Sequence, residues 1–403
     1  MKQTSRITST YSADTMGVCS ALFELGGMTI MHDASGCNST YTTHDEPRWY
    51  DMDSMVYISG LTEMEAIMGD DEKLLGDIED AVRELHPKFV AIAGTPIPTM
   101  TGFDFEAVAA LAEERTGVPC FGFPTTGMNT YIHGASLAFE ALAERFAEEV
   151  PEKGKATEGI AADGEKTKAN ILGLTPLDFS VNGQDASIAE WLESEGIEVV
   201  SRWAMGSSAD EIAMAGAADV NLVVSASGLA AARVLQERFG TPYAVGLPIG
   251  DKLSGLLADM IKAKADIEER ETGVHPDIFL SIDNSAADPY ETGFVAVIGE
   301  GITSLSLAKA VELECGIPAK VICATECPED LLRDCDRIAP DEEDIMEEIK
   351  DAAFVIADPL YKPICPETAS FISLPSEAFS GRLYRSDIPN LIANPEAILD
   401  QLK

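Results

Sequence analysis

The sequence is poor in basic residues. It contains 28 Lys and Arg against 69 Asp and Glu, which gives a formal net charge of −41. A protein with this charge repels the phosphate backbones of nucleic acids and the surfaces of anionic membranes. We therefore expect no nucleic acid and no membrane among its partners, and we interpret the acidity as a solvated surface.

Long apolar runs are absent as well. No stretch reaches the roughly 18 apolar residues that span a bilayer. The first residues, MKQTSRITSTYSADTMG, lack the apolar stretch of a secretory signal. Together these absences predict a cytoplasmic protein. Eight cysteines in a reducing compartment then indicate thiolates that bind metal or lie buried, and not a disulfide framework.

The chain also lacks the usual nucleotide-binding sequences. No Walker A sequence is present, so ATP, if it is used, must be hydrolysed by another protein. A glycine turn at Gly299 and Gly301 follows a β-rich run, but Ser304 stands where the third glycine of a dinucleotide fingerprint belongs. We therefore expect a tight turn at this place and not a dinucleotide site.

What the sequence does contain is a regular alternation. From Lys88 onward, short β-rich runs alternate with amphipathic helical stretches, which is typical of parallel sheets built from βαβ units. The β-rich runs fall into three groups: 88–94 and 118–124; 170–174, 197–203, 220–226 and 242–247; 294–301, 319–326 and 352–359.

This grouping predicts the fold class. A chain of 403 residues is too long for one ordinary core, and we expect an α/β protein with three Rossmann-like, doubly wound parallel-sheet domains. The predicted domains are 1–150, 169–290 and 291–403. The segment 151–168 is charged and without periodicity, so it is expected to be a linker, and 275–293 is a plausible second junction.

Ligands of open parallel sheets collect beyond the carboxyl ends of the strands. These ends are predicted at Gly94-Thr95, Pro124-Thr125, Ser225, Gly299 to Gly301, Cys323 to Cys327, and Asp358. If the ends of the three sheets face one another, they enclose a cavity.

Cys19 and Cys37 lie ahead of this alternation, in a glycine-rich segment. Iron–sulfur clusters usually take four thiolates, so two cysteines per chain complete a site only across a symmetric subunit interface. Two unrelated buried cysteines explain the residues about equally well. His32 and His44 flank Cys37, and each is either a partner of such a site or a structural histidine.

Several segments resemble the nitrogenase component 1 superfamily. They are GVCSAL around Cys19, MHDASGC ending at Cys37, the stretch 51–78, and HPKFVAIAGT ending at Thr95. The resemblance continues through all three groups of strands. The family includes the molybdenum–iron protein subunits of nitrogenase, their cofactor-assembly homologues, the protochlorophyllide and chlorophyllide reductases, and the reductive cyclase of coenzyme F430 synthesis.

The resemblance implies roles for particular residues. Cys19 and Cys37 fall on the family's first two cluster-ligating cysteines, and Thr95 stands where the third is expected, which implies a [4Fe-4S] type of cluster at a subunit interface. Ser225 and Pro375 stand at the places of the cysteine and histidine that hold the iron–molybdenum cofactor in nitrogenase. A hydroxyl and a proline ring do not replace these ligands, so no such cofactor is expected.

The resemblance also implies partners and a reaction. We expect a homodimer or a complex with a homologous subunit, which receives electrons from an iron protein that hydrolyses ATP. The substrate is not dinitrogen, and the cavity between the units is expected to hold either a bulky organic substrate or a differently held metal centre. A cofactor-assembly scaffold of the same family and a non-catalytic binding or sensing homologue are the alternatives.

The remaining candidates carry weaker signals. Cys315, Cys323, Cys327 and Cys335 match no metal-binding spacing and are expected to be buried packing residues, with metal binding or redox work as the alternative. The same two interpretations apply to Cys365, whereas Cys120 lies within a strand and is expected in the core. Glu300 is expected to be a solvated turn carboxylate, with a proton donor as the alternative.

Overall fold

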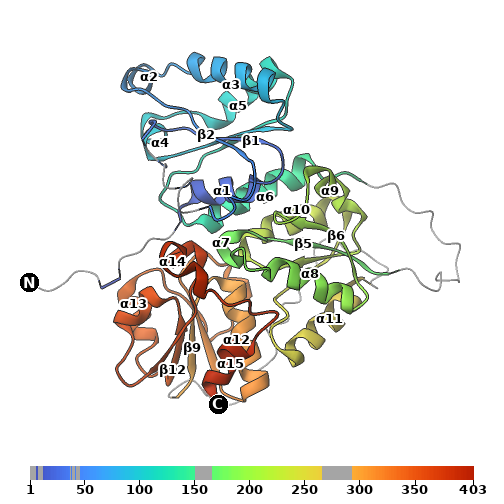
Figure 1. Cartoon of the computed structure of the whole chain (residues 1–403), viewed down its shortest axis with the longest axis vertical. Coiled ribbons are helices and arrows are strands. Elements are labelled where there is room, and N and C mark those ends of the chain that lie inside the picture. Colours follow the sequence, from blue (N-terminus) through green and yellow to red (C-terminus); the bar gives the residue numbers. More distant parts are fainter. Residues whose placement is uncertain are drawn as a thin grey trace, which may run out of the picture.

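The computed structural model describes residues 6–7, 12–36, 38, 41, 46–149, 166–265 and 293–403. In this part of the chain the strands form three separate sheets in which each neighbouring pair is parallel (Figure 1). We call the parts around them the first unit (12–149), the second unit (166–265) and the third unit (293–403). The predicted α/β class with parallel sheets is thereby confirmed.

The first sheet has the strand order β2-β1-β3-β4. Its strands are β1 (Met28–Met31), β2 (Met55–Ile58), β3 (Val90–Ala93) and β4 (Cys120–Phe123). The short helices α2 (Glu63–Met68) and α4 (Pro96–Thr101) follow β2 and β3. The helices α3 (Glu72–Leu85) and α5 (Phe105–Thr116) pack on the outer face, while α1 (Asp14–Leu22) and α6 (Tyr131–Arg145) lie between this sheet and the other two units (Figure 1).

The alternation of strands and helices begins earlier in the chain than the expected start at Lys88. The segment before Lys88 supplies β1 and β2, and β1 lies at the centre of the first sheet with Met28 beside both Met55 and Val90. β1 (MTIM) contains a single Ile and no Val, whereas β2 (MVYI) carries the same apolar pattern as the later strands and is nevertheless missing from the predicted strands.

The second sheet has the order β6-β5-β7-β8. Its strands are β5 (Lys168–Leu172), β6 (Glu198–Trp203), β7 (Val220–Val223) and β8 (Tyr243–Val245). The helices of this unit are α7 (Pro176–Phe179), α8 (Gln184–Ser194), α9 (Ala209–Ala213), α10 (Leu229–Phe239) and α11 (Asp251–Ala265), with the short turn η3 (Ala226–Gly228) ahead of α10. β5 begins at the last residue of the expected linker, of which 151–165 lies outside the described residues, as does nearly all of 275–293.

The third sheet has the order β11-β10-β9-β12-β13. Its strands are β9 (Val295–Gly299), β10 (Ala319–Cys323), β11 (Arg337–Ile338), β12 (Phe354–Ala357) and β13 (Ser370–Ser373). Its helices are α12 (Gly301–Cys315), α13 (Glu342–Glu348), α14 (Glu377–Tyr384) and α15 (Glu396–Leu399). The segment between α14 and α15 reaches the second unit, where the Leu391 N–H donates to Gln184 Oε1 at 2.7 Å.

One apolar core runs through all three units and includes side chains from α1, α6, α10, α12 and the strands of each sheet. No helix in the described part of the chain is long and apolar enough to cross a membrane. The first unit is joined to the second mainly through α6, which packs against α1 on one side and α10 on the other.

Two glycines permit the close approach of α1 and α6. A Cβ added at Gly17 would overlap the carbonyl of Tyr131, and one added at Gly134 would overlap the carbonyl of Asp14. The backbones of the two helices are therefore in direct contact, and the position of α1 is fixed by packing against α6.

This contact gives a stability prediction. Gly134→Ala should lower the free energy of unfolding by about 2 kcal/mol, because the methyl group forces the two helices apart. Gly76→Ala is the matched control, since a Cβ at this position in α3 meets nothing within 4 Å. It should raise the free energy of unfolding by about 0.5–1 kcal/mol, as alanine usually does in a helix. Urea denaturation of both variants measures these effects, and equal stability of Gly134→Ala and the parent protein would contradict the contact.

Candidate functional site

Cys19 lies in the middle of α1, and its side chain is completely buried. It belongs to a small apolar cluster together with Met16, Phe23, Met31, Tyr41 and Val56. Burial raises the pKa of the Cys19 thiol well above its usual range, and the negative charge of Glu46 raises it further. The free thiol is therefore protonated, and a metal that binds it must displace this proton.

Cys37 and His44 lie outside the described residues. Their neighbours Asn38 and Tyr41 are described: the Tyr41 N–H donates to the Asn38 carbonyl at 3.0 Å, and the Asn38 amide donates to Asp33 Oδ2 at 3.0 Å. Because Tyr41 packs in the same cluster as Cys19, the chain on either side of Cys37 is held close to α1.

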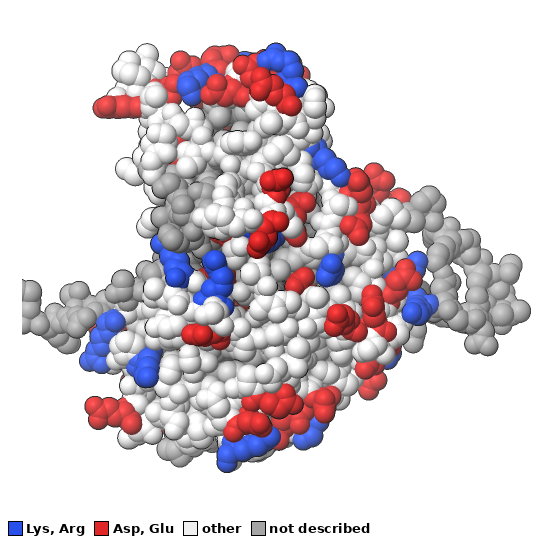
Figure 2. Space-filling view, in the orientation of Figure 1, with Lys and Arg blue, Asp and Glu red and all other residues white. Residues whose placement is uncertain are grey.

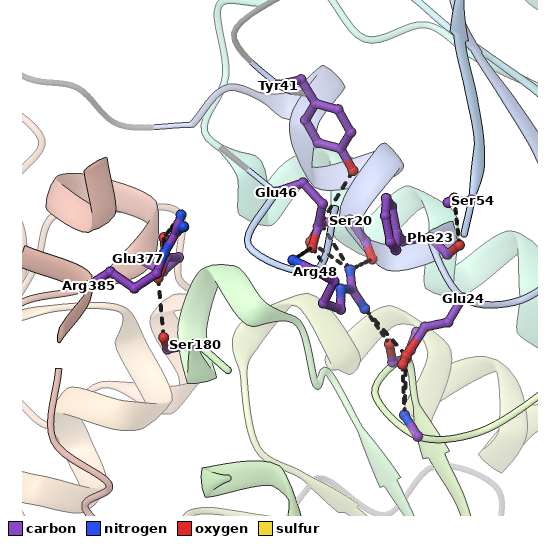
Figure 3. A network of polar contacts seen from close by, with 12 residues as sticks. Ser20, Phe23, Glu24, Tyr41, Glu46, Arg48, Ser54, Ser180, Glu377 and Arg385 are labelled. Carbon is purple, nitrogen blue, oxygen red and sulfur yellow. Dashed lines mark hydrogen bonds and ion pairs between the residues drawn. The ribbon is translucent and has the colours of Figure 1, made fainter. Parts of the chain in front are cut away.

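Figure 3 shows a buried ion pair of Glu46 and Arg48, and the charge of Glu46 is near enough to act on the Cys19 thiol. Arg48 Nε contacts Glu46 Oε1 at 2.7 Å, and both side chains are almost fully enclosed. The hydroxyls of Tyr41 and Ser20 donate to Glu46 Oε2, each at 3.3 Å. This pair therefore fixes Tyr41 and α1 around the Cys19 cluster.

Arg48 also connects the first unit to the second. Its guanidinium donates to the carbonyls of Ser20 at 2.8 Å and Ala204 at 3.1 Å, and it lies 4.7 Å from the centroid of the Phe23 ring. Beside it, Glu24 accepts a hydrogen bond of 2.9 Å from the Gly206 N–H (Figure 3). Loss of one partner of a buried ion pair leaves an uncompensated charge. Separation of the first and second units at this point therefore has a high free-energy cost.

A hydrogen bond joins Thr95 to His32. The Thr95 hydroxyl donates to the His32 carbonyl at 2.9 Å, and both side chains are buried. His32 Nδ1 hydrogen-bonds the Ser59 hydroxyl at 2.9 Å, and its ring lies 4.3 Å from that of Phe103. Burial lowers the pKa of His32 to about 4, so the imidazole is neutral near pH 7. These contacts support the structural alternative for His32.

A cavity of about 60 Å³ lies between the second and third units. Its lining includes three carboxyl side chains, Asp178 from α7, Glu300 before α12 and Asp358 after β12, together with Pro375 and Tyr361. Part of the predicted cavity at the strand ends is thus present, at Gly299, Glu300 and Asp358. A space of this size holds a few water molecules and not a large ligand.

Ser225 belongs to the wall behind this cavity. Its hydroxyl donates to Asp178 Oδ2 at 2.7 Å, and the Tyr131 hydroxyl donates to Asp178 Oδ1. Tyr131 comes from α6 of the first unit, so all three units meet around Asp178. Burial raises the pKa of the Asp178 carboxyl well above its usual range, and the charge of Glu300 adds to this effect.

Glu300 is not a solvated turn carboxylate, and that expectation is wrong. Its side chain is only 7% exposed, because the end of β9 faces the second unit and not solvent. Its carboxylate accepts hydrogen bonds from the N–H groups of Thr303 at 2.8 Å, Ile302 at 3.1 Å and Ala226 at 2.9 Å. Glu300 therefore both caps α12 and hydrogen-bonds to the second unit. Burial raises the pKa of its carboxyl as well.

The other cysteines are distributed through the core. Cys120 is buried in the core of the first unit, which confirms that expectation, and Cys323 and Cys327 are buried next to one another in the third. The half-buried thiols of Cys315 and Cys365 donate to the carbonyls of Leu399 and Tyr361. Within the described ranges, no group of three or more His, Cys, Asp or Glu side chains is arranged to hold a metal ion.

The sequence did not single out Tyr131, Asp178, Glu46 or Arg48. Asp178 could have been suspected, because an acidic residue within the apolar sequence LTPLDF just after a strand is unusual. Nothing in the sequence distinguishes Tyr131, Glu46 or Arg48 from ordinary surface residues, since their partners lie far along the chain or in another unit.

The fold resembles that of known nitrogenase structures. The structure of nitrogenase Cp1 at pH 6.5 superposes with a TM-score of 0.56 and 15% sequence identity, covering 100% of this chain and 73% of that one. The structure of nitrogenase Cp1 at pH 5 gives a TM-score of 0.55 and 16% identity, covering 87% of this chain and 72% of that one. At this level of identity the likeness concerns the fold alone.

Two proteins with partial sequence similarity to this chain differ from one another in function. The nitrogenase iron-molybdenum cofactor biosynthesis protein NifE of Clostridium pasteurianum is 29% identical over 188 residues, which are 46% of this chain and 38% of that protein. A subunit of the light-independent protochlorophyllide reductase of Nostoc punctiforme is 26% identical over 184 residues, which are 45% of this chain and 36% of that protein. The match thus spans well under half the length of either relative.

The family comparison covers much more of the chain. Residues 14–357 match the family model described as nitrogenase component 1 type oxidoreductase. This match includes Cys19, Cys37, Thr95, Ser225 and Glu300, and it confirms the resemblance seen in the sequence. The chain therefore belongs to the nitrogenase component 1 type oxidoreductase family.

Proposed function

We propose that this chain is one subunit of a nitrogenase-like reductase that does not act on dinitrogen. In this proposal a separate iron protein hydrolyses ATP and supplies electrons, and Cys19 and Cys37 hold an iron–sulfur cluster at a subunit interface. The substrate is bound between the second and third units. The observation that carries the proposal is the enclosed thiol of Cys19, which packs against Met31 and Tyr41, in a family of oxidoreductases.

The chemistry of the described donors fits such a cluster. Cys19 is a soft ligand in an apolar site, which suits iron–sulfur ligation. Thr95 offers only a hydroxyl, and this hydroxyl already donates to the His32 carbonyl. Each chain therefore provides two thiols, and two chains together provide the four that a [4Fe-4S] cluster needs. When bound, such a cluster supplies one-electron transfer.

The surface of the first unit supports a subunit partner. Met64, Ile67 and Met68 of α2 and Met100 of α4 are each at least 67% exposed, and α2 has no buried residue. The two helices pack side by side, and the apolar side chains of α2 lie beside the acidic Glu63 and Glu65, so that uncharged and acidic atoms adjoin at this end of the molecule (Figure 2). Apolar side chains gathered on a surface mark an interaction site. We infer that this surface receives a second copy of the chain or a homologous subunit.

The cavity supports a reduction coupled to protonation. Asp178 and Glu300 border it, and burial raises the pKa of both carboxyls, so that a proton is retained there nearer to neutral pH. A carboxyl with a raised pKa is suited to donate a proton to a reduced substrate. Because the cavity now has room only for a few waters, a large substrate requires the second and third units to move apart.

The test of this function is a reduction assay without oxygen. The reconstituted cluster should be reduced by the iron protein encoded in the same organism, with dithionite as electron source, only when MgATP is present. Electron paramagnetic resonance detects the reduced cluster. Reduction by NADH alone, or by the iron protein without ATP, would contradict the proposed electron path.

A cofactor-assembly scaffold is the second candidate, and the similarity to NifE favours it. A scaffold transfers its metal cluster to an acceptor protein, whereas a reductase keeps its cluster during turnover. Incubation of the iron-loaded protein with a metal-free acceptor separates the two. Stoichiometric movement of iron to the acceptor supports the scaffold, and retention of iron together with reduction that requires ATP supports the reductase.

The first prediction concerns the cluster ligands. Cys19→Ala and Cys37→Ala should each lose nearly all of the bound iron and sulfide and the brown colour, because two of the four thiolates disappear from a symmetric site. Iron and sulfide analysis of protein purified without oxygen measures this loss. Cys120→Ala is the matched control, since Cys120 is a buried cysteine of the same unit, and it should keep its iron. Full iron in Cys19→Ala would refute the assignment.

The second prediction concerns metal identity. Ser225 offers a hydroxyl that is engaged with Asp178, and Pro375 offers no ligand atom to the cavity that it lines. Neither replaces a thiolate or an imidazole, so the purified protein should contain no stoichiometric molybdenum or vanadium and should not form ammonia from dinitrogen. Elemental analysis and an ammonia assay measure this. One molybdenum per chain would overturn the prediction.

A further inference from the structure

The thiols of Cys323 and Cys327 lie close to one another in the third unit. Cys323 is the last residue of β10, and Cys327 follows in the loop beyond it. The two thiols are close enough for Cys327 to raise the pKa of the Cys323 thiol. Both sulfurs also lie near one point at the start of α12, since a Cβ built on Gly301 would be 2.5 Å from Cys327 Sγ and 3.7 Å from Cys323 Sγ. Glycine at position 301 thus leaves the space that the Cys327 sulfur occupies, with the Cys323 sulfur in van der Waals range of the same point.

The loop between these cysteines is not fully satisfied. The Thr325 hydroxyl is 3% exposed and has no hydrogen-bond partner within the described ranges. A buried hydroxyl without a hydrogen-bond partner raises the free energy of the folded state. A second arrangement of the loop that gives the Thr325 hydroxyl a partner removes this cost. Such a rearrangement need only involve the five residues from Cys323 to Cys327.

The same loop joins the third unit to the first. Glu326 lies between the two cysteines, and its carboxylate accepts hydrogen bonds from the N–H of Thr130, at 3.0 Å, and from the Thr130 hydroxyl. Thr130 immediately precedes α6, and the next residue, Tyr131, donates to Asp178 beside the cavity. A change in the loop is therefore transmitted to the place where the three units meet.

We propose that Cys323 and Cys327 form a reversible disulfide, and that its formation weakens the contact of Glu326 with the start of α6. A disulfide draws the two neighbouring sulfurs to a covalent distance of about 2.05 Å, and it closes the loop that carries Glu326 into a small ring. The pair is thus a redox-sensitive site in the wall of the junction, separate from Cys19 and Cys37.

A low-molecular-weight disulfide such as oxidised glutathione is the oxidant in this reaction. The thiolate of Cys327, the more exposed of the two, attacks one glutathione sulfur and releases one glutathione. The Cys323 thiolate then attacks the mixed disulfide and releases the second. The two protons of the protein thiols end on the two released glutathiones, so the protein loses two electrons and the oxidant gains them.

The rate of this reaction depends on the pKa of the Cys323 thiol. The neighbouring thiol of Cys327 raises this pKa, and burial raises it further. The pair therefore remains a dithiol at neutral pH in the absence of oxidant, and oxidation should become faster as the pH rises, because only the thiolate reacts.

The test uses the full chain, kept without oxygen and treated with oxidised glutathione. After denaturation in an alkylating agent, mass spectrometry examines the tryptic peptide 321–333, which contains both cysteines. The untreated peptide should carry two alkyl groups, and the treated peptide should carry none and have lost two hydrogens. Dithiothreitol should restore the first form. Hydrogen exchange at the start of α6 should be at least about threefold faster in the oxidised protein.

Three variants make the test decisive. Cys327→Ser should show neither the disulfide nor the change in exchange, and Cys315→Ser should show both. Glu326→Gln should speed the exchange at the start of α6 without any oxidant. Full alkylation of both cysteines in the treated protein, under conditions that oxidise a synthetic peptide of the sequence 321–333, would overturn the disulfide. A disulfide that leaves the exchange of α6 unchanged would overturn the link to the junction.

Discussion

Carboxylates that accept hydrogen bonds from a neighbouring unit hold the three units together. Glu300 of the third unit accepts from Ala226 of the second, Glu326 of the third from Thr130 of the first, and Glu24 of the first from Gly206 of the second. Glu377, which is paired with Arg385, accepts from the Ser180 hydroxyl in the same way (Figure 3). Glu300 and Glu377 are buried acceptors that require their donors, and together with the exposed contact of Glu326 and the half-buried contact of Glu24 they fix how the units sit relative to one another.

The same constraint shapes the cavity. Its carboxyls, Asp178, Glu300 and Asp358, are enclosed because the ends of the strands face another unit, and no Lys, Arg or His is found among its described lining residues. Asp358 accepts hydrogen bonds from the Ser376 N–H and the Ser380 hydroxyl, and burial raises the pKa of all three carboxyls. We interpreted the acidic residues of the sequence as solvated surface, but some of them are buried inside the protein.

The two candidate sites are connected through a pair of helices. Cys19 lies on α1, and Tyr131, which donates to Asp178, begins α6. Gly17 and Gly134 allow the backbones of these helices to touch, so the Cys19 cluster and the cavity wall are parts of one rigid contact. In the proposed reductase, electrons would arrive on the side of α1 and protons on the side of Asp178, with this helix pair between them.

Local patterns in the sequence are enough to predict the strands of the later units and the family. β3 to β10 and β12 are predictable because buried parallel strands are short continuous apolar runs. β1 (MTIM) gives this signal only weakly, and β2 (MVYI) gives it but is not among the predicted strands. Cys19, Cys37, Thr95, Ser225 and Pro375 come from the resemblance, and their roles as ligands or replaced ligands stay predictions. The folded chain alone reveals that Glu300 is buried, that Tyr131 meets Asp178 and that Cys323 meets Cys327 beside Gly301. Burial and hydrogen-bond partners depend on segments that are distant in the chain, and no local pattern encodes which of these segments come together.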